Sequence, residues 1–408
     1  MSKGRKVLGS ALMLGAVLWI AYYIIRIKGY CSIDASALSD GQITAIKKSI
    51  QLAVVVSGFL IGGLLGAVVQ RSKFCIASAC HSIVTTRDLT QTRAYAMALF
   101  IAIPATQLLY GAGAADISRS IYISSPFTWL SYIVGGFIFG VGIVYAGGCA
   151  SRILVRAGEG NLGGLVSVLA FIFASGATLW GITATVRANY LDKLTLNLKS
   201  QYLPNVFGNA PVWVTVLVIE AVLLLFMLKS PKDSEWRKLK WPLAGAAIGL
   251  IIAAAWCVNG LAYRAIPHVD TFSFSGPDDP TLLQAWGPKS LTFALADAQA
   301  FRYIILWTGE TINFAVATVF GVIAGSLVSA LISGTFNWIA PPLQQFKYNL
   351  VGGLLMGFGA VLAMGCNIGQ GLSGISTLSI GSFLTMSFIF AGAIAGAKFM
   401  TWRIMREA

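Results

Sequence analysis

The sequence predicts an all-α polytopic membrane protein of about ten transmembrane helices, with re-entrant or broken half-helices and an internal inverted repeat. Of the 408 residues, 57% are hydrophobic and only 11% are charged, whereas about a quarter of the residues in a soluble globular domain are charged. In addition, residues 134–149 (VGGFIFGVGIVYAGGC) align without gaps on residues 351–366 (VGGLLMGFGAVLAMGC), and nine of the sixteen pairs are identical.

The repeat extends beyond this glycine-rich core. Residues 171–174 (FIFA) recur 217 residues later as residues 388–391, so the two copies cover residues 134–174 and 351–391. Each core ends on a thiol, which suggests a duplicated membrane protein with a sulfur-lined central site.

Ten stretches approach the length of about 20 apolar residues that a helix needs to cross the hydrocarbon core. They are residues 7–25, 51–69, 94–111, 130–147, 163–186, 211–228, 242–262, 305–333, 348–365 and 378–398. Glycine recurs every fourth residue in some of them, as in Gly58, Gly62 and Gly66. Because this spacing lets membrane helices approach closely, we expect tight helix crossings.

Lys and Arg in short loops indicate the orientation, because cytoplasmic loops carry an excess of them. The basic segment 229–240 is therefore predicted to be cytoplasmic, and the long polar connection 263–302, which includes Asp297, is predicted to face outward. Alternating helices then place both termini in the cytoplasm. The predicted location is the inner membrane of a bacterium.

In this topology the copy that ends at Cys149 runs inward and the copy that ends at Cys366 runs outward, so the repeat is inverted. Transporters with inverted repeats bind their substrate near the midplane, where interrupted helices of both halves meet. One similarity does not follow this scheme, because Gly63 pairs with Gly325 at a different offset and in the same direction. Either this similarity is accidental or one apolar stretch is re-entrant.

The repeat divides one integral membrane domain into four parts. Residues 1–50 form an extra helix and loop, and residues 51–228 form the first half. Residues 229–304 contain the basic loop, a membrane helix and the outward connection, and residues 305–408 form the second half.

The net charge of +14 does not indicate nucleic acid binding, because the basic residues fall between apolar runs instead of forming a basic domain. They indicate topology, contact with membrane lipid and attraction for an anion. The six cysteines and two histidines include no CxxC pair and no cluster at zinc spacing. Neither a metal nor another cofactor is therefore expected.

Polar residues interrupt both copies directly after the cysteine. Ser151 and Arg152 follow the first thiol, and Asn367 and Gln370 follow the second. Non-helical backbone at membrane depth is tolerated only where it is buried in protein or lines a cavity. A helix that restarts there aims its N–H groups and positive dipole end at the break, which favours an anion. The alternative is an ordinary glycine-rich turn at the membrane surface.

A third thiol lies in residues 71–75 (RSKFC), at the end of the second apolar stretch. Arg71 and Lys73 would raise the local anion concentration at the cytoplasmic mouth, or they could serve as positive-inside anchors. Two acidic residues, Glu220 and Glu310, lie inside apolar stretches, where an ionisable group suggests function. Glu310 is a candidate to carry a proton with the anion or to pair with an Arg near a helix end.

The repeat ends AGGC and MGCN, together with RSKFC…RD, resemble motifs of the YeeE/YedE family of sulfur transport proteins. The best understood members of this family take up thiosulfate. The resemblance covers roughly residues 55–400 and implies a carrier, without catalytic residues, that is hourglass-shaped and contains re-entrant half-helices. It further implies that thiosulfate passes along Cys75, Cys149 and Cys366 through S–H···S contacts, and that a TusA-like sulfur carrier is the cytoplasmic partner.

Thiosulfate suits a thiol path because its soft terminal sulfur can accept from a weak thiol donor, while its sulfonate oxygens accept from backbone N–H groups. Family members often show Gly-Cys-x-x-Gly-His, and neither copy here has that histidine. Arg152 and Gln370 are the candidates to replace it. The departure leaves sulfite, sulfane sulfur and selenium compounds open as substrates.

Other classes of protein remain alternatives. A membrane thiol oxidoreductase would need a pair of cysteines able to form a disulfide, and the sequence offers Cys75 and Cys80, five residues apart. A cation channel would need more carboxylates or histidines within the apolar stretches. A scaffold without transport would leave the repeated cysteines unexplained.

Overall fold

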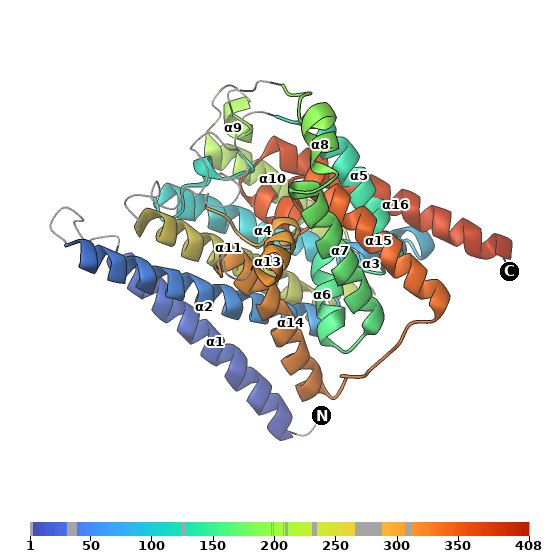
Figure 1. Cartoon of the computed structure of the whole chain (residues 1–408), viewed down its shortest axis with the longest axis horizontal. Helices are drawn as coiled ribbons and strands as arrows, with labels where there is room; N and C mark the ends of the chain where they lie inside the picture. Colours follow the sequence, from blue (N-terminus) through green and yellow to red (C-terminus); the bar gives the residue numbers. More distant parts are fainter. Residues whose placement is uncertain are drawn as a thin grey trace.

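The computed structural model describes residues 3–30, 39–123, 127–196, 198, 200–206, 208, 211–230, 235–265, 288–306 and 312–407. Within these ranges regular structure is helical, apart from three isolated β-bridges. Eight described segments are long and apolar enough to cross a membrane. The fold is therefore the all-α polytopic membrane protein that the sequence predicts (Figure 1).

Long helices make up most of the molecule, with α1 at the edge beside α2 and α16 projecting on the opposite side (Figure 1). They are α1 (Lys3–Tyr30), α2 (Asp40–Ser72), α4 (Thr90–Gly111), α5 (Trp129–Tyr145), α7 (Leu162–Leu179), α10 (Val212–Leu228), α11 (Lys240–Ala265), α14 (Phe314–Ser333), α15 (Leu343–Leu362) and α16 (Ile380–Glu407).

Shorter helices lie between the long ones and form the central site. They are α3 (Ile76–Thr85), α6 (Ala150–Gly158), α13 (Phe293–Ile305) and the π-helical turn η6 (Gly369–Gly374). The connections contain further single turns, namely η2 (Ile117–Arg119), α8 (Ala184–Val186), η3 (Arg187–Leu191), α9 (Leu203–Val206) and η4 (Glu235–Arg237).

Each of the ten predicted stretches overlaps a helix, with errors at the fifth and the eighth. The fifth, residues 163–186, extends beyond α7, which ends at Leu179, into the separate turn α8. Residues 305–333 are not one span, because α13 ends at Ile305 and α14 begins at Phe314. Residues 266–287 of the predicted polar connection 263–302 lie outside the described residues, and for residues 288–302 the prediction of a polar loop is wrong. Residues 288–292 are buried and α13 packs against α7 and α14. Small alanines surround Asp297 in this helix, so its average hydropathy conceals a buried element.

Helices α5 and α15, which carry the repeated glycine pattern, pack antiparallel. Gly135 lies against Gly359, while Gly142 lies against Gly352. Because Gly352 and Gly359 are the copies of Gly135 and Gly142 at the offset of 217, each contact has its counterpart with the two copies exchanged. Reciprocal contacts of this kind are typical of two units related by a twofold axis.

The helices on either side of this pair, α7 and α16, are also exchanged between the two copies. Gly140 of α5 packs against α16, and its copy Gly357 of α15 packs against α7. A Cβ at Gly140 would lie 2.3 Å from the Ile389 carbonyl oxygen, and one at Gly357 would lie 2.5 Å from that of Phe171. Helices α5, α7, α15 and α16 therefore form a core whose crossings exclude any side chain at these glycines.

Helices α2 and α14 pack parallel to each other. Gly62 and Gly66 of α2 lie against the carbonyls of Thr318 and Val322, and Gly325 lies against the Gly63 carbonyl. The similarity of Gly63 and Gly325 thus corresponds to a direct contact in a parallel pair, which glycines four residues apart make possible.

Candidate functional site

Each of the three predicted cysteines lies shortly before a short helix or helical turn. Cys75 is the N-cap residue of α3 and Cys149 is the N-cap residue of α6, while Cys366 precedes η6 by three residues. The first N–H groups of a helix have no partner within the helix and carry the positive end of its dipole. The sequence-predicted breaks therefore present N–H groups beside buried sulfur.

The first two thiols touch each other. The Sγ atoms of Cys75 and Cys149 are 3.7 Å apart, and the N–H of Cys149 donates to Cys75 Sγ at 3.5 Å. Ser151 Oγ lies 3.4 Å from Cys149 Sγ. Both cysteines are buried and unbridged, so the site holds two thiols from distant parts of the chain within contact distance.

The third thiol has different neighbours. Cys366 Sγ accepts hydrogen bonds from the N–H groups of Phe293 and Gly369, each at 3.4 Å. Phe293 is the first residue of α13 and Gly369 is the first residue of η6. The N-terminal ends of two helices therefore meet at one fully buried sulfur.

Several buried polar groups beside Cys366 lack hydrogen-bond partners. Both polar atoms of the Asn367 side chain are in this condition, as are the hydroxyls of Thr292 and Tyr122, which lie next to Gly369. Asp297, one turn into α13, has neither carboxylate oxygen paired. Because buried polar groups are ordinarily satisfied, this concentration of orphaned groups marks a place suited to a polar ligand.

Tyr95 of α4 connects the two regions. Its hydroxyl donates to the backbone carbonyl of Asn367, and its ring stacks on Phe74 with the centroids 5.6 Å apart. Phe74 directly precedes Cys75 in the sequence, and Asn367 directly follows Cys366. Tyr95 is thus placed between the thiol pair and the third thiol.

The residues that the sequence suggests as supporting groups fall into two classes. Ser151 and Asn367 lie at the thiols, as described above. Gln370 is committed to the protein itself, because it donates to the Ala363 carbonyl and accepts from Ser382. Arg152 pairs with Glu159 at 3.3 Å. Their side chains therefore hold the two broken segments in place.

The basic pair before Cys75 lies at an exposed position. Arg71 and Lys73 are both exposed, and Arg71 Nε donates to Ser329 of α14 at 3.3 Å. Glu310 lies outside the described residues. Glu220 of α10 is described, and neither of its carboxylate oxygens has a partner. Within the described ranges no three His, Cys, Asp or Glu side chains group together as a metal site requires.

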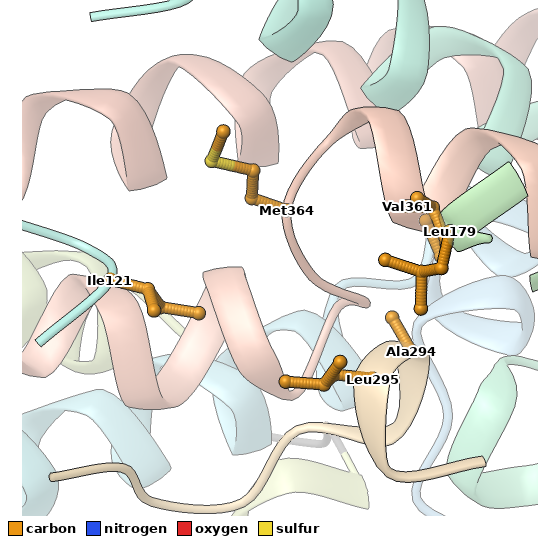
Figure 2. Close-up of a pocket in the computed structure, with 7 residues that line it drawn as sticks. Ile121, Leu179, Ala294, Leu295, Val361 and Met364 are labelled. Carbon is orange, nitrogen blue, oxygen red and sulfur yellow. The ribbon is translucent and has the colours of Figure 1, made fainter. Parts of the chain in front are cut away.

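A small apolar cavity of about 20 Å³ lies near the third thiol. Figure 2 shows Met364, on the loop that follows α15, facing it together with Leu295 of α13 and Ile121. Leu179 and Val361 also line the cavity. A space of this size holds about one water, and apolar walls give that water no hydrogen-bond partners. The cavity is therefore expected to stay dry. Met364, which lines it, is two residues from Cys366 in the sequence.

Sequence reasoning missed four residues of the Cys366 region: Tyr95, Tyr122, Thr292 and Asp297. Tyr95 and Tyr122 carry no motif, and their roles depend on tertiary contacts. The other two were assigned to the outward connection because polar residues surround them in the sequence. An alternative signal existed in the alanines at positions 294, 296, 298 and 300, which predict a closely packed helix.

Broken helices with their N-termini at a buried site, inside a bundle of apolar helices long enough to cross a membrane, are typical of membrane transport proteins. The chain belongs to the sulphur transport family, whose pattern matches residues 71–395. The YeeE/YedE resemblance is thereby confirmed. No part of the match depends on α1, which lies before residue 71.

Two relatives extend over nearly the whole chain. The chain is 28% identical over 371 residues to the thiosulfate transporter TsuA of Spirochaeta thermophila, which covers 86% of this chain and 99% of the relative. It is 26% identical over 376 residues to the thiosulfate transporter TsuA of Escherichia coli, with 87% and 97% covered. Both relatives therefore correspond to this chain over almost their full length.

Proposed function

We propose that this protein takes up thiosulfate, or a closely related sulfur anion, and passes it along Cys366, Cys149 and Cys75. The observation that carries the proposal is the placement of the three buried thiols at helix starts: Cys75 and Cys149 are N-cap residues, and Cys366 accepts from the first N–H groups of α13 and η6. The names of the two relatives support a sulfur anion as the substrate.

The chemistry of the two ends of thiosulfate matches the two kinds of group in the site. The terminal sulfur is a soft acceptor for an S–H donor, which Cys149 and Cys366 can supply. The sulfonate oxygens accept from N–H groups and hydroxyls, which the helix N-termini and Thr292 supply. Sulfate has no soft end, so a path of thiols favours thiosulfate over sulfate.

The test is uptake of sulfur-labelled thiosulfate into cells that lack their own thiosulfate and sulfate importers. The unaltered chain should accumulate label, and Cys149→Ala should not, although it reaches the membrane in equal amount. Uptake by both would reject the thiol path and retain transport. No uptake by either would replace thiosulfate with sulfite, sulfane sulfur or a selenium compound as the substrate to assay.

A second candidate function is a membrane thiol oxidoreductase, and the contact of Cys75 with Cys149 favours it. A separation of 3.7 Å requires only a small movement to reach the bond length of a disulfide, about 2.05 Å. Mass-shift labelling of free thiols distinguishes the two functions. The same number of alkylatable cysteines under oxidising and reducing conditions would reject the oxidoreductase.

The proposal includes the setting of the protein. We infer an inner-membrane location with both termini in the cytoplasm and two repeat halves at residues 51–228 and 305–408. We also infer that a TusA-like sulfur carrier receives the sulfur in the cytoplasm. The parallel and antiparallel helix pairs support the alternating directions of this topology. Reporter fusions at each terminus test it, since a periplasmic signal from either end would reject the orientation.

A further inference from the structure

Helix α13 brings a carboxyl group to the Cys366 site. The N–H of Phe293 donates to Cys366 Sγ at 3.4 Å, and Asp297 follows four residues later on the same face of the helix. An anion whose sulfur contacts Cys366 would therefore sit about one helical turn from this carboxyl group.

The carboxyl group is buried without compensation. Asp297 has 0% exposure, and neither carboxylate oxygen has a hydrogen-bond partner. Its neighbours in α13 are buried alanines, such as Ala294, Ala296 and Ala300. Because an ionised carboxylate in such surroundings is costly unless it is paired or hydrated, a site closed to water favours the neutral acid, which has one O–H donor.

No opposite charge pairs with Asp297 in the part of the chain that the structure describes. Helices α7 and α14, which pack most extensively on α13, contain no ionisable side chain. The ionisable group tied to this helix at the site is Cys366, which accepts from the N–H of Phe293. The other ionisable groups on α13, its N-terminal approach and the helices packed against it are Lys289, Arg302, Tyr303, Lys347, Tyr348, Arg152 and Arg156.

We propose that Asp297 binds a proton whenever an anion occupies the Cys366 site, so that uptake of the anion is coupled to the entry of that proton. The proposal rests on the function proposed above and adds the coupling ion to it. The reason is electrostatic, since a dianion beside an ionised carboxylate would be repelled at short range in a weakly polarisable environment.

The proton balance of the step is simple. A proton from the water on the side of entry forms the O–H bond of Asp297, and the neutral acid can donate to a sulfonate oxygen. When the anion moves on towards Cys149 and water enters from the side of exit, the O–H bond breaks and the proton is transferred to that water. No electron transfer takes part, and the positive charge of the proton offsets part of the charge that the anion carries.

Purified protein in lipid vesicles with a pH-sensitive dye inside tests the coupling. An inward proton gradient should raise the initial uptake of labelled thiosulfate by up to about tenfold per pH unit where protonation limits the rate. Thiosulfate added outside should acidify the interior. If the unaltered protein takes up thiosulfate with no response to the gradient and no acidification, the coupling is wrong and the proposed function stands. If it takes up no thiosulfate under any gradient, both fail.

Two substitutions at one position sharpen the result. Asp297→Asn mimics the neutral acid, so it should keep downhill uptake but lose both the response to pH and the acidification. Asp297→Glu restores a proton site and should restore the pH response. A matched control is Asp192→Asn, because Asp192 is paired with Arg187 at 3.3 Å, away from the thiols. A pH response retained in Asp297→Asn would overturn the proposal, and the dye measurement on the unaltered protein does not depend on whether the variants fold.

Discussion

The two copies of the repeat share a scaffold, yet their thiols lie in different environments. Cys149 contacts the thiol of Cys75 and the hydroxyl of Ser151. Cys366 instead accepts from two backbone N–H groups, beside unpartnered polar side chains. The helix crossings around them are reciprocal, so the crossings do not account for the difference.

Much of the difference comes from segments outside the repeat. Helix α3 brings Cys75 to the first copy, and α13 brings Phe293 and Asp297 to the second. The two related copies thus carry two unlike binding stations. The first station, around Cys149, presents thiols to the sulfur of a ligand. The second station, around Cys366, also presents hydrogen-bond donors to the oxygens of a ligand. The comparison yields the four predictions below.

The largest effect is expected where the two copies are most alike. Gly140→Val and Gly357→Val place side chains against the carbonyls of Ile389 and Phe171. Overpacking typically costs about 1–3 kcal/mol, and a rigid backbone contact gives no room for relief. Both variants should lose most of their membrane abundance, to similar extents, as measured by immunoblot of solubilised membranes.

Gly15→Val is the matched control, because a Cβ at Gly15 meets no atom within 4 Å. Its abundance should equal that of the unaltered protein. A loss of abundance in only one of the two core variants would show that the two helix crossings are not equivalent. The two copies of the repeat would then not share one scaffold.

The next effect concerns the thiols themselves. Cys149→Ser and Cys366→Ser preserve size but remove the soft donor, and a hydrogen bond to a charged ligand is worth about 1.5–3 kcal/mol. Initial uptake of thiosulfate should therefore fall by roughly 10–100-fold in each. Cys257→Ser, in α11, should transport normally. Normal uptake in either site variant would remove that thiol from the path.

Tyr95 joins the two stations, and its removal should have an intermediate effect. Tyr95→Phe keeps the stacking on Phe74 but leaves the Asn367 carbonyl without its donor. A neutral hydrogen bond contributes about 1 kcal/mol, so the uptake rate should fall by about fivefold. Tyr110→Phe in the same helix is the control. Equal rates for both variants would mean that the Tyr95 hydroxyl only supports structure.

The smallest effect distinguishes the first station from the second. Ser151→Ala removes the hydroxyl 3.4 Å from Cys149 Sγ, a long contact worth about 0.5 kcal/mol. The KM for thiosulfate should rise by about twofold, with little change in maximal rate. Ser387→Ala on the exposed face of α16 is the control. A change in maximal rate alone would contradict a role in binding.

Much of the fold follows from patterns that are local in sequence. Apolar length predicts the membrane helices, and the glycine positions predict where they cross, because a close crossing needs residues without side chains. The repeat at residues 134–149 and 351–366 also identified two of the three helix breaks. These features recur in the printed sequence, so no tertiary information is needed to see them.

The remainder of the site depends on contacts between distant segments. The approach of Cys75 to Cys149 spans 74 residues, and that of Phe293 to Cys366 spans 73. Residues 293–302 of α13 were assigned to the outward connection because they continue a long polar segment that is rich in aspartate, including Asp297, and poor in basic residues. A hydropathy average cannot separate a short buried helix with one carboxyl group from a polar loop.

The most direct test of the account uses purified protein in lipid vesicles and thiosulfate labelled at its terminal sulfur. The unaltered chain should accumulate intact labelled thiosulfate, and an excess of sulfate should not slow it. A triple variant with Ala at Cys75, Cys149 and Cys366 should match empty vesicles. Uptake by the triple variant at the rate of the unaltered chain, or equal inhibition by sulfate, would contradict transport along the thiols.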